Sequence, residues 1–202
     1  NGARVVNISY GVSGSSTVQS AAQYLRNKGG VVVVSAGNTS ALDSTAAHDS
    51  LLTVAATDSN DARASFSTYG SFVDLAAPGV GIYATTRGGS YGNWSGTSFS
   101  SPITAATAAL MLSANSRLTP ADIDRILKST AVDLGTAGFD QYYGYGRIDA
   151  ARAVAAARAT VASDTQAPTI SITSPTGGKV ASVVPVDVNY SANVGATRAE
   201  LY

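Results

Sequence analysis

The chain has no cysteine among its 202 residues, which excludes disulfide bonds, thiolate catalysis and cysteine-ligated metals. It also has a single histidine and few charged residues, 13% against about 25% in an average soluble domain. Ser, Thr, Ala and Gly largely take the place of the charged residues. Surfaces that are solubilised by hydroxyl groups are common outside the cell, so we expect a secreted protein.

The chain also lacks net charge and long apolar runs. Thirteen basic residues balance thirteen acidic ones, which removes the electrostatic reason to expect nucleic acid or an anionic membrane as a partner. No apolar run approaches the ~18 residues of a membrane span, and residues 1–4 do not resemble a signal peptide. Because a buried-strand pattern already begins at residue 4, we expect that the chain starts inside a domain whose first part is absent.

What the chain does have is an alternation of apolar strands and amphipathic or buried helices. This order predicts an α/β fold, in which a parallel sheet is flanked by helices and its first two strands are joined by a right-handed crossover. In the helix predicted at 98–113, Pro102 is expected in the first turn, where a missing amide costs nothing. The expected strands are 4–8, 31–34, 51–56 and 72–76, and the expected helices are 17–28, 98–113, one beginning at Pro120, and 149–157.

The residue pattern of the sequence changes after Arg158. We expect one domain over 1–158, a linker over 159–168, and a second module over 169–202. Strands are predicted at 170–172, 184–190 and 198–202, separated by glycine-containing turns. A β-sandwich needs about 100 residues, so the last segment is interpreted as the first strands of an incomplete β-sandwich.

Polar turns follow two of the predicted strands, and a third polar turn opens the buried helix at Ser98. Ligands of parallel sheets collect where the carboxyl ends of the strands open onto a crevice. Either strand-end turn alone is compatible with an ordinary connection, but three together favour a functional site. A nucleotide site is disfavoured, because no Gly-x-Gly-x-x-Gly or phosphate-binding loop follows any strand.

Six blocks of sequence, in order and at suitable spacing, resemble the subtilisin-like serine proteases, or subtilases. The resemblance covers about residues 4–157, roughly the C-terminal two-thirds of a subtilase domain, and it implies a protease of polypeptide substrates. The strand pattern of residues 169–202 is separately interpreted as the start of an immunoglobulin-like module. The blocks are VVNISYG, VVVVSAGN, RASFSTYG, DLAAPGV, SGTSFSSP and YGYGRIDAARAV.

The resemblance implies roles for individual residues. Ser98 matches the nucleophile, whose own amide also binds the developing oxyanion, and Asn38 matches the asparagine that donates its side-chain amide to that oxyanion. The remaining matches concern substrate binding. They are the strand edge Ser9, Tyr10 and Gly11, the pocket wall Ala36 and Gly37, and Thr97 of the Gly-Thr-Ser signature.

A serine nucleophile needs a general base, and the only histidine of the chain is His48. The family's catalytic histidine lies in a Gly-Thr-His setting that is missing here, and His48 falls on a variable loop. We therefore predict a solvated loop histidine. Because the subtilase triad runs Asp, His, Ser along the chain, both missing members are expected upstream of Asn1, and this chain alone is expected to be inactive.

Other polar and aromatic residues are expected to have structural roles. Asp58, Asp61 and Asp74 are expected to cap and to form turns. The aromatic run from Tyr142 to Gly146 is expected to pack against the last helix, with an exposed binding surface as the alternative. No cofactor is required for the chemistry, no metal ligand is assigned, and a structural calcium ion remains open. We expect a monomer, and keep as an alternative a non-catalytic binding protein of the same fold.

Overall fold

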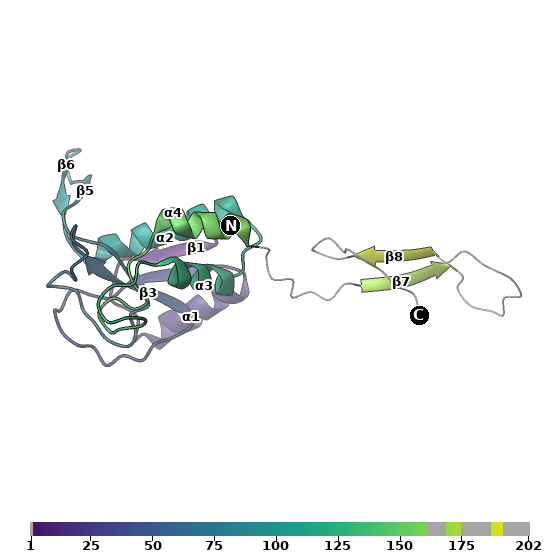
Figure 1. Ribbon diagram of the computed structural model, residues 1–202, viewed down its shortest axis with the longest axis horizontal. Helices are drawn as coiled ribbons and strands as arrows, with labels where there is room; N and C mark the ends of the chain where they lie inside the picture. Colours follow the sequence, from purple (N-terminus) through teal and green to yellow (C-terminus); the bar gives the residue numbers. More distant parts are fainter. Residues whose placement is uncertain (1, 161–168, 175–186, 192–202) are drawn as a thin grey trace, which may run out of the picture. The chain divides into compact units, whose positions relative to one another are not determined.

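The computed structural model describes residues 2–160, 169–174 and 187–191. The chain divides into two units, Asn1–Ala162 and Ser163–Tyr202. The first contains the predicted α/β fold (Figure 1). In the described part of the chain, none of the helices is both long and apolar enough to cross a membrane.

Four parallel strands form the main sheet in the order β1-β2-β3-β4. Their bounds are β1 Val5–Ile8, β2 Val31–Ser35, β3 Leu51–Thr57 and β4 Leu75–Pro78. Every residue of β2 and β3 is buried, as expected for parallel strands that are covered on both faces. The predicted parallel sheet is therefore confirmed.

Alternate residues of β2 enter different hydrophobic clusters. Val31 and Val33 join the cluster that contains α2 (Thr97–Ala114), α3 (Pro120–Thr130) and α4 (Ala150–Ala159). Val32 and Val34 pack instead with residues of α1 (Ser16–Asn27). Figure 1 shows α2 and α4 on one side of the sheet and α1 on the other. The continuous apolar run of β2 thus serves both faces of the sheet.

Two local expectations differ from the structure. The strand expected at 72–76 is β4 at Leu75–Pro78, because Phe72 and Val73 are buried in a turn and not paired in the sheet. Pro102 is the sixth residue of α2 and so lies in the second turn, not the first. The missing amide therefore removes a hydrogen bond that the helix would otherwise form.

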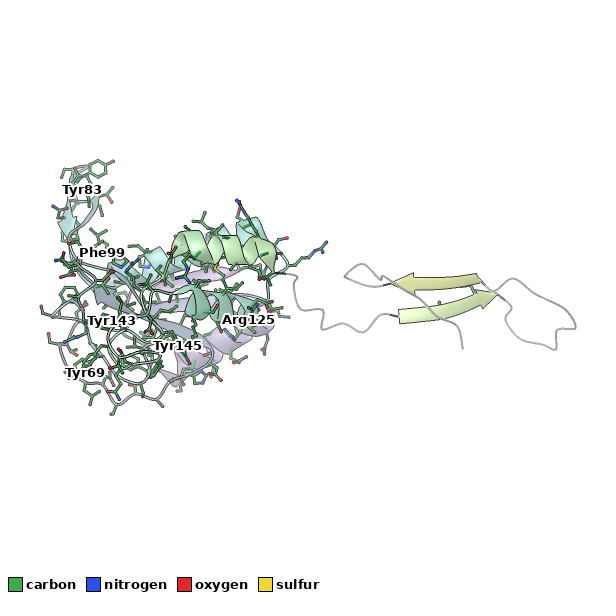
Figure 2. All side chains as sticks on the ribbon, in the orientation of Figure 1. Tyr69, Tyr83, Phe99, Arg125, Tyr143 and Tyr145 are labelled. Carbon is green, nitrogen blue, oxygen red and sulfur yellow. The ribbon has the colours of Figure 1, made fainter. Side chains whose placement is uncertain are left out.

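A β-hairpin that follows β4 and precedes α2 in the sequence was not predicted. Its strands are β5 (Ile82–Thr85) and β6 (Tyr91–Trp94), paired antiparallel. Tyr83 and Tyr91 stack with ring centroids 5.7 Å apart. Figure 2 shows Tyr83 on this hairpin, away from the body of the unit. Gly88 and Gly89 between two aromatic-containing runs are the signal that could have predicted it.

In the aromatic run near Tyr142, which was expected to pack against the last helix, Tyr142 and Tyr143 contact loop residues, and the Tyr145 ring lies beneath Lys128 of α3. Tyr143 joins the cluster around Phe72, and its hydroxyl accepts a hydrogen bond of 3.0 Å from the Arg63 amide. The ring of Tyr142 lies 4.8 Å from that of Tyr69, and the Arg63 guanidinium covers both rings.

The second unit contains one described antiparallel pair, β7 (Thr169–Ser174) with β8 (Asp187–Ser191). These strands overlap the predictions at 170–172 and 184–190. The strand predicted at 198–202 lies outside the described residues.

Candidate active site

Ser98 is the second residue of α2, and the segments that follow three strands meet around it. Ser9 follows β1, and its carbonyl accepts a hydrogen bond of 3.2 Å from Ser98 Oγ. Asn38 follows β2 and bonds to Thr97, while Gly79 follows β4 and accepts from the Gly96 amide at 2.8 Å. The three polar turns expected to form a site are thus brought together at the carboxyl ends of the strands.

Asn38 is held in one orientation by Thr97. Its Oδ1 accepts hydrogen bonds of 3.0 Å from both the amide and the hydroxyl of Thr97. Because an amide N–H only donates, the atom facing it must be the oxygen, which fixes the side-chain amide without ambiguity. No described residue accepts a hydrogen bond from Asn38 Nδ2. This NH2 group is therefore available to a ligand.

The free NH2 of Asn38 and the amide of Ser98 lie around one point in space. A Cβ atom built on Gly96 would lie 3.6 Å from Asn38 Nδ2 and 3.8 Å from the Ser98 nitrogen. Gly96 has φ 156° and ψ 153°, which a side chain would strain, and its missing side chain leaves this point open. Both nitrogens therefore lie within 4 Å of the same open point.

The helix adds to the same electrostatic preference. Ser98 lies in the first turn of the 18-residue helix α2, which contains no acidic residue in that turn. A helix N-terminus carries about half a positive elementary charge, so it stabilises a negative charge at this position. The geometry and the dipole both favour an anion beside Ser98.

The residues predicted to bind substrate line two neighbouring backbone segments. A Cβ on Gly11 would lie 3.6 Å from Gly37 Cα and 3.9 Å from the Ala36 carbonyl oxygen, so these segments are in close contact. Tyr10 is 75% exposed, whereas Ala36 is buried. The segment from Ser9 to Gly11 thus borders the site with an open backbone.

Thr97, predicted to bind substrate, is fully buried. Its hydroxyl accepts from the Gly37 amide at 3.2 Å and donates to Asn38 Oδ1. With these contacts Thr97 orients Asn38 and joins it to the pocket wall.

Sequence reasoning missed two polar residues, Asn7 and Ser101. Ser101 Oγ donates to Asn7 Oδ1 at 2.6 Å, and Asn7 Nδ2 donates to Ser9 Oγ at 3.0 Å. Ser101 is fully buried in α2 although it is polar. The available signal was the several hydroxyl residues on a helix whose remaining residues are small or apolar, because buried polar groups need partners.

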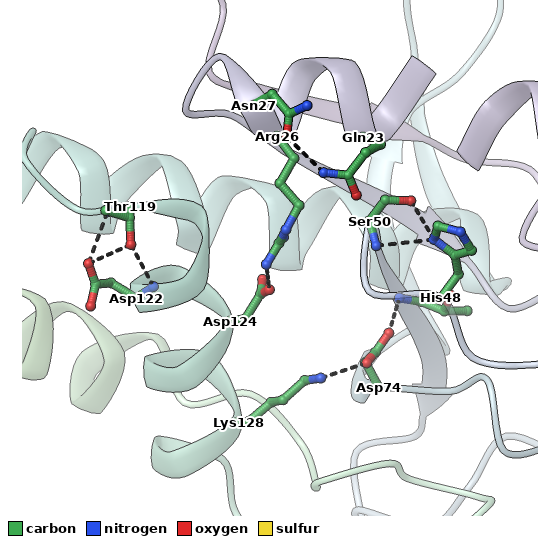
Figure 3. A network of polar contacts seen from close by, with 11 residues as sticks. Gln23, Arg26, Asn27, His48, Ser50, Asp74, Thr119, Asp122, Asp124 and Lys128 are labelled. Carbon is green, nitrogen blue, oxygen red and sulfur yellow. Dashed lines mark hydrogen bonds and ion pairs between the residues drawn. The ribbon is translucent and has the colours of Figure 1, made fainter. Parts of the chain in front are cut away.

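His48 has a different environment. Its Nδ1 lies 2.8 Å from Ser50 Oγ (Figure 3). The imidazole also borders a groove along α1 that is lined by Gln19, Gln23 and Tyr24. Within the described residues, no imidazole or carboxylate bonds to Ser98 Oγ.

A second polar network holds α1 and α3 to the sheet (Figure 3). Lys128 Nζ lies 2.8 Å from Asp74 Oδ1, Asp74 Oδ2 accepts from the Thr53 amide at 2.9 Å, and Arg26 pairs with Asp124. Burial raises the pKa of Asp74, and the neighbouring Lys128 opposes that rise. Asp74 was expected only to cap or to form a turn, but in the structure it joins α3 to β3.

Potential metal ligands do not gather in the described part of the chain. It contains no group of three or more His, Cys, Asp or Glu side chains that could hold a metal ion. Both oxygens of Asp74 are bonded to protein groups. These side chains do not fit an acidic calcium site, and we assign none.

Comparison with known proteins gives a consistent result. The model of the subtilase family matches residues 1–146. Thermitase of Thermoactinomyces vulgaris is 40% identical over 156 residues, 76% of this chain and 54% of thermitase. Subtilisin DY of Bacillus licheniformis is also 40% identical over 156 residues, 74% of this chain and 56% of that protein.

A solved structure of proteases from Pseudoalteromonas arctica PAMC 21717 aligns with a TM-score of 0.66 at 36% identity, over 78% of this chain and 52% of that one. A lanthipeptide protease at 24% identity and TM-score 0.66 shares the fold. The chain spans about half the length of thermitase and subtilisin DY. With the family match extending over most of its length, this chain belongs to the subtilase family.

Proposed function

We propose that Ser98 is the nucleophile of a serine endopeptidase and that Asn38 Nδ2 and the Ser98 amide form its oxyanion hole. The observation that carries this proposal is the convergence of these two donors on the point beside Gly96. The relatives named thermitase and subtilisin DY support the same chemistry. We propose that the substrate is a polypeptide, bound along the backbone from Ser9 to Gly11, with Ala36 and Gly37 forming a pocket wall.

In this mechanism Ser98 Oγ forms a bond to the carbonyl carbon of the scissile amide. The electron pair of the C=O bond moves onto the oxygen, where the two donors stabilise it. The serine proton passes to an imidazole base and then to the leaving amine as the C–N bond breaks, which leaves an acyl-enzyme on Ser98.

The described residues supply the nucleophile and the oxyanion donors, but not the base. His48 bonds to Ser50, and its loop is separate from Ser98 in the hydrogen-bond network. We therefore propose that this chain alone hydrolyses peptide bonds at most very slowly, and that a longer form of the protein contributes the histidine and aspartate. None of the groups in this scheme requires a cofactor.

Three further proposals concern the location, the oligomeric state and the C-terminal segment of the protein. The low charge and the hydroxyl-rich composition support an extracellular location, and we propose that the protein is a monomer. The antiparallel pair β7–β8 supports an incomplete immunoglobulin-like module over residues 169–202, following a domain over 1–158 and a linker.

A fluorophosphonate probe tests the assignment, with the modified residue located by mass spectrometry. We expect the protein with its upstream sequence to be labelled at Ser98, the Ser98→Ala variant to remain unlabelled, and the chain of 202 residues to react far more slowly. Ser95→Ala, which removes an exposed neighbouring hydroxyl, is the matched control and should be labelled normally. Rapid labelling of the short chain would contradict its inactivity, and an unlabelled Ser98 in the longer protein would contradict the nucleophile assignment.

A further inference from the structure

The carbonyl oxygen of Ser98 lacks its helical partner. In an α-helix this oxygen accepts a hydrogen bond from the amide four residues later, and that residue here is Pro102, which has no amide hydrogen. A half-buried carbonyl without a donor is costly, so the chain must either tolerate that cost or supply another donor.

The hydroxyl of Ser9 supplies that donor. Ser9 Oγ donates to the Ser98 carbonyl oxygen at 2.9 Å, while Ser98 Oγ donates to the Ser9 carbonyl oxygen at 3.2 Å. The two residues are therefore joined by a reciprocal pair of hydrogen bonds. This pair ties the nucleophile to the end of β1, across 89 residues of sequence.

The direction of the Ser9 hydroxyl is itself determined by its neighbours. Ser101 Oγ donates to Asn7 Oδ1, and Asn7 Nδ2 donates to Ser9 Oγ at 3.0 Å. Because Ser9 Oγ already accepts from Asn7, its single proton is directed to the Ser98 carbonyl. The donors run in one direction from Ser101 to Ser98, an arrangement in which each bond strengthens the next.

We propose that the side chain of Ser9 is a positioning residue for the nucleophile, that Pro102 creates the need for it, and that Asn7 and Ser101 orient it. This inference rests on the proposed role of Ser98 and is separate from the backbone contact with substrate assigned to Ser9. In this arrangement the hydrogen bonds between Ser9 and Ser98 hold the first turn of α2 to the end of β1, although position 102 has no amide hydrogen. This attachment limits how Ser98 can move during attack.

A double-mutant cycle between Ser9 and Pro102 tests the inference without requiring activity. Ser9→Ala should lower the thermal unfolding midpoint of the chain by about 2–6 °C, because the Ser98 carbonyl loses its donor. In the Pro102→Ala background the helix regains an amide for that carbonyl, so the same Ser9→Ala change should cost less than about half as much.

Two further variants sharpen this cycle. Asn7→Asp preserves shape but replaces the donor to Ser9 with an acceptor, so it should draw the Ser9 proton away and also destabilise the chain. Ser129→Ala removes a hydroxyl that bonds to the Ile126 carbonyl in α3, and its cost should be the same with or without Pro102→Ala. An equal cost of Ser9→Ala in both backgrounds would overturn the proposal.

The second readout is the rate at which a fluorophosphonate labels Ser98 in the longer protein. Per folded molecule, Ser9→Ala should slow labelling about three- to tenfold, and Ser9→Thr, which keeps the hydroxyl, should recover most of the rate. An unchanged rate for Ser9→Ala would limit Ser9 to stability and so overturn the positioning role. If the parent protein itself is not labelled, the proposed function fails, while the thermal cycle still decides whether Ser9 supports the Ser98 carbonyl.

Discussion

Asn38 illustrates how a single contact determines what a residue can do. Its sequence position predicts an amide near the site, but an asparagine can present either its oxygen or its nitrogen. The backbone N–H of Thr97 can donate only to the oxygen, so the NH2 group is the end of the side-chain amide that stays free. At the residue scale, then, the chemistry of the site depends on which atom of Asn38 is already occupied.

Asn38→Asp tests the free NH2 group separately from the bond to Thr97. The substitution keeps an oxygen that accepts from Thr97 and removes the hydrogen-bond donor. In the longer, active protein we expect kcat to fall about 100- to 1,000-fold, the range known for losing this kind of donor in subtilisin, with a smaller change in KM. Steady-state kinetics on a peptide substrate measure the effect, and the unfolding midpoint controls for folding. A kcat within threefold of the parent value would remove Asn38 from the oxyanion hole.

The start of α2 depends on a close approach to the loop after β4. A Cβ on Gly79 would lie 2.4 Å from Ser100 Oγ and 2.7 Å from Ala56 Cβ. Ser100 uses this space to donate hydrogen bonds of 3.0 and 3.2 Å to the carbonyls of Ala77 and Pro78. The absence of a side chain at Gly79 therefore lets the nucleophile helix dock on the end of the sheet.

We expect Gly79→Ala to lower the free energy of unfolding by about 1–3 kcal/mol, because overpacking forces backbone shifts. Urea denaturation of the chain measures this loss. Gly14→Ala is the control, since its Cβ would meet nothing closer than 3.4 Å, and it should change stability little. Equal stability of the two variants would show that α2 does not need the close contact.

The capping box of α3 makes the stability of that helix depend on pH. Thr119 Oγ1 accepts from the Asp122 amide, and Asp122 Oδ2 accepts from the Thr119 amide at 3.0 Å. Burial of Asp122 acts to raise its pKa, but these bonds from Thr119, together with Arg125, hold the pKa below its usual value. The carboxylate is thus the form that the folded state favours.

Asp122→Asn should therefore cost about 0.5–1 kcal/mol at neutral pH. Because the folded-state pKa is lowered, this contribution is present above the unfolded-state pKa and disappears as pH falls through the folded-state value. The stabilities of parent and variant should converge on acidification, as followed by denaturation at a series of pH values. A difference that stays constant into acid would contradict the lowered pKa.

At the scale of the whole molecule, charged pairs connect the helices to a core that is otherwise apolar. Lys128 of α3 binds Asp74 at the entrance to β4, and Asp74 also accepts from Thr53 in β3. Burial raises the pKa of Asp74, and Lys128 counteracts it. Burial acts to lower the pKa of Lys128, but Asp74 raises it overall. The ammonium group thus favours the ionised form of a buried carboxylate at the junction of sheet and helix, against the effect of burial.

Lys128→Met should destabilise the first unit by about 1–3 kcal/mol at neutral pH, because it leaves the Asp74 carboxylate without its counter-charge. The pKa of Asp74 rises further in this variant, so the folded state takes up a proton more readily and the loss should shrink as pH falls. Lys28→Met, which changes a lysine lying over the Tyr24 ring, is the control and should have a small effect. A loss that grows on acidification would contradict this account.

The order of elements and the nucleophile turn were predictable because their signals are local. The apolar run at Val31–Ser35 and the small, apolar composition of α2 each lie within a few residues of sequence. The hairpin β5–β6 was missed because its short strands carry mixed polar and aromatic residues. The strand near Phe72 was displaced because burial in a turn has the same apolar signature as burial in a sheet.

By itself, the sequence determined the α/β class, the serine turn and the presence of only one candidate base, since composition and short-range periodicity need no knowledge of folding. Only the tertiary structure decided that Asn38 presents its nitrogen, that Ser9 replaces the amide missing at Pro102, and that His48 bonds elsewhere. The bonds from Asn38 and Ser9 to α2 join residues that are 59 and 89 positions apart. Such contacts depend on how the strands and α2 pack, and no local pattern of residues encodes that packing.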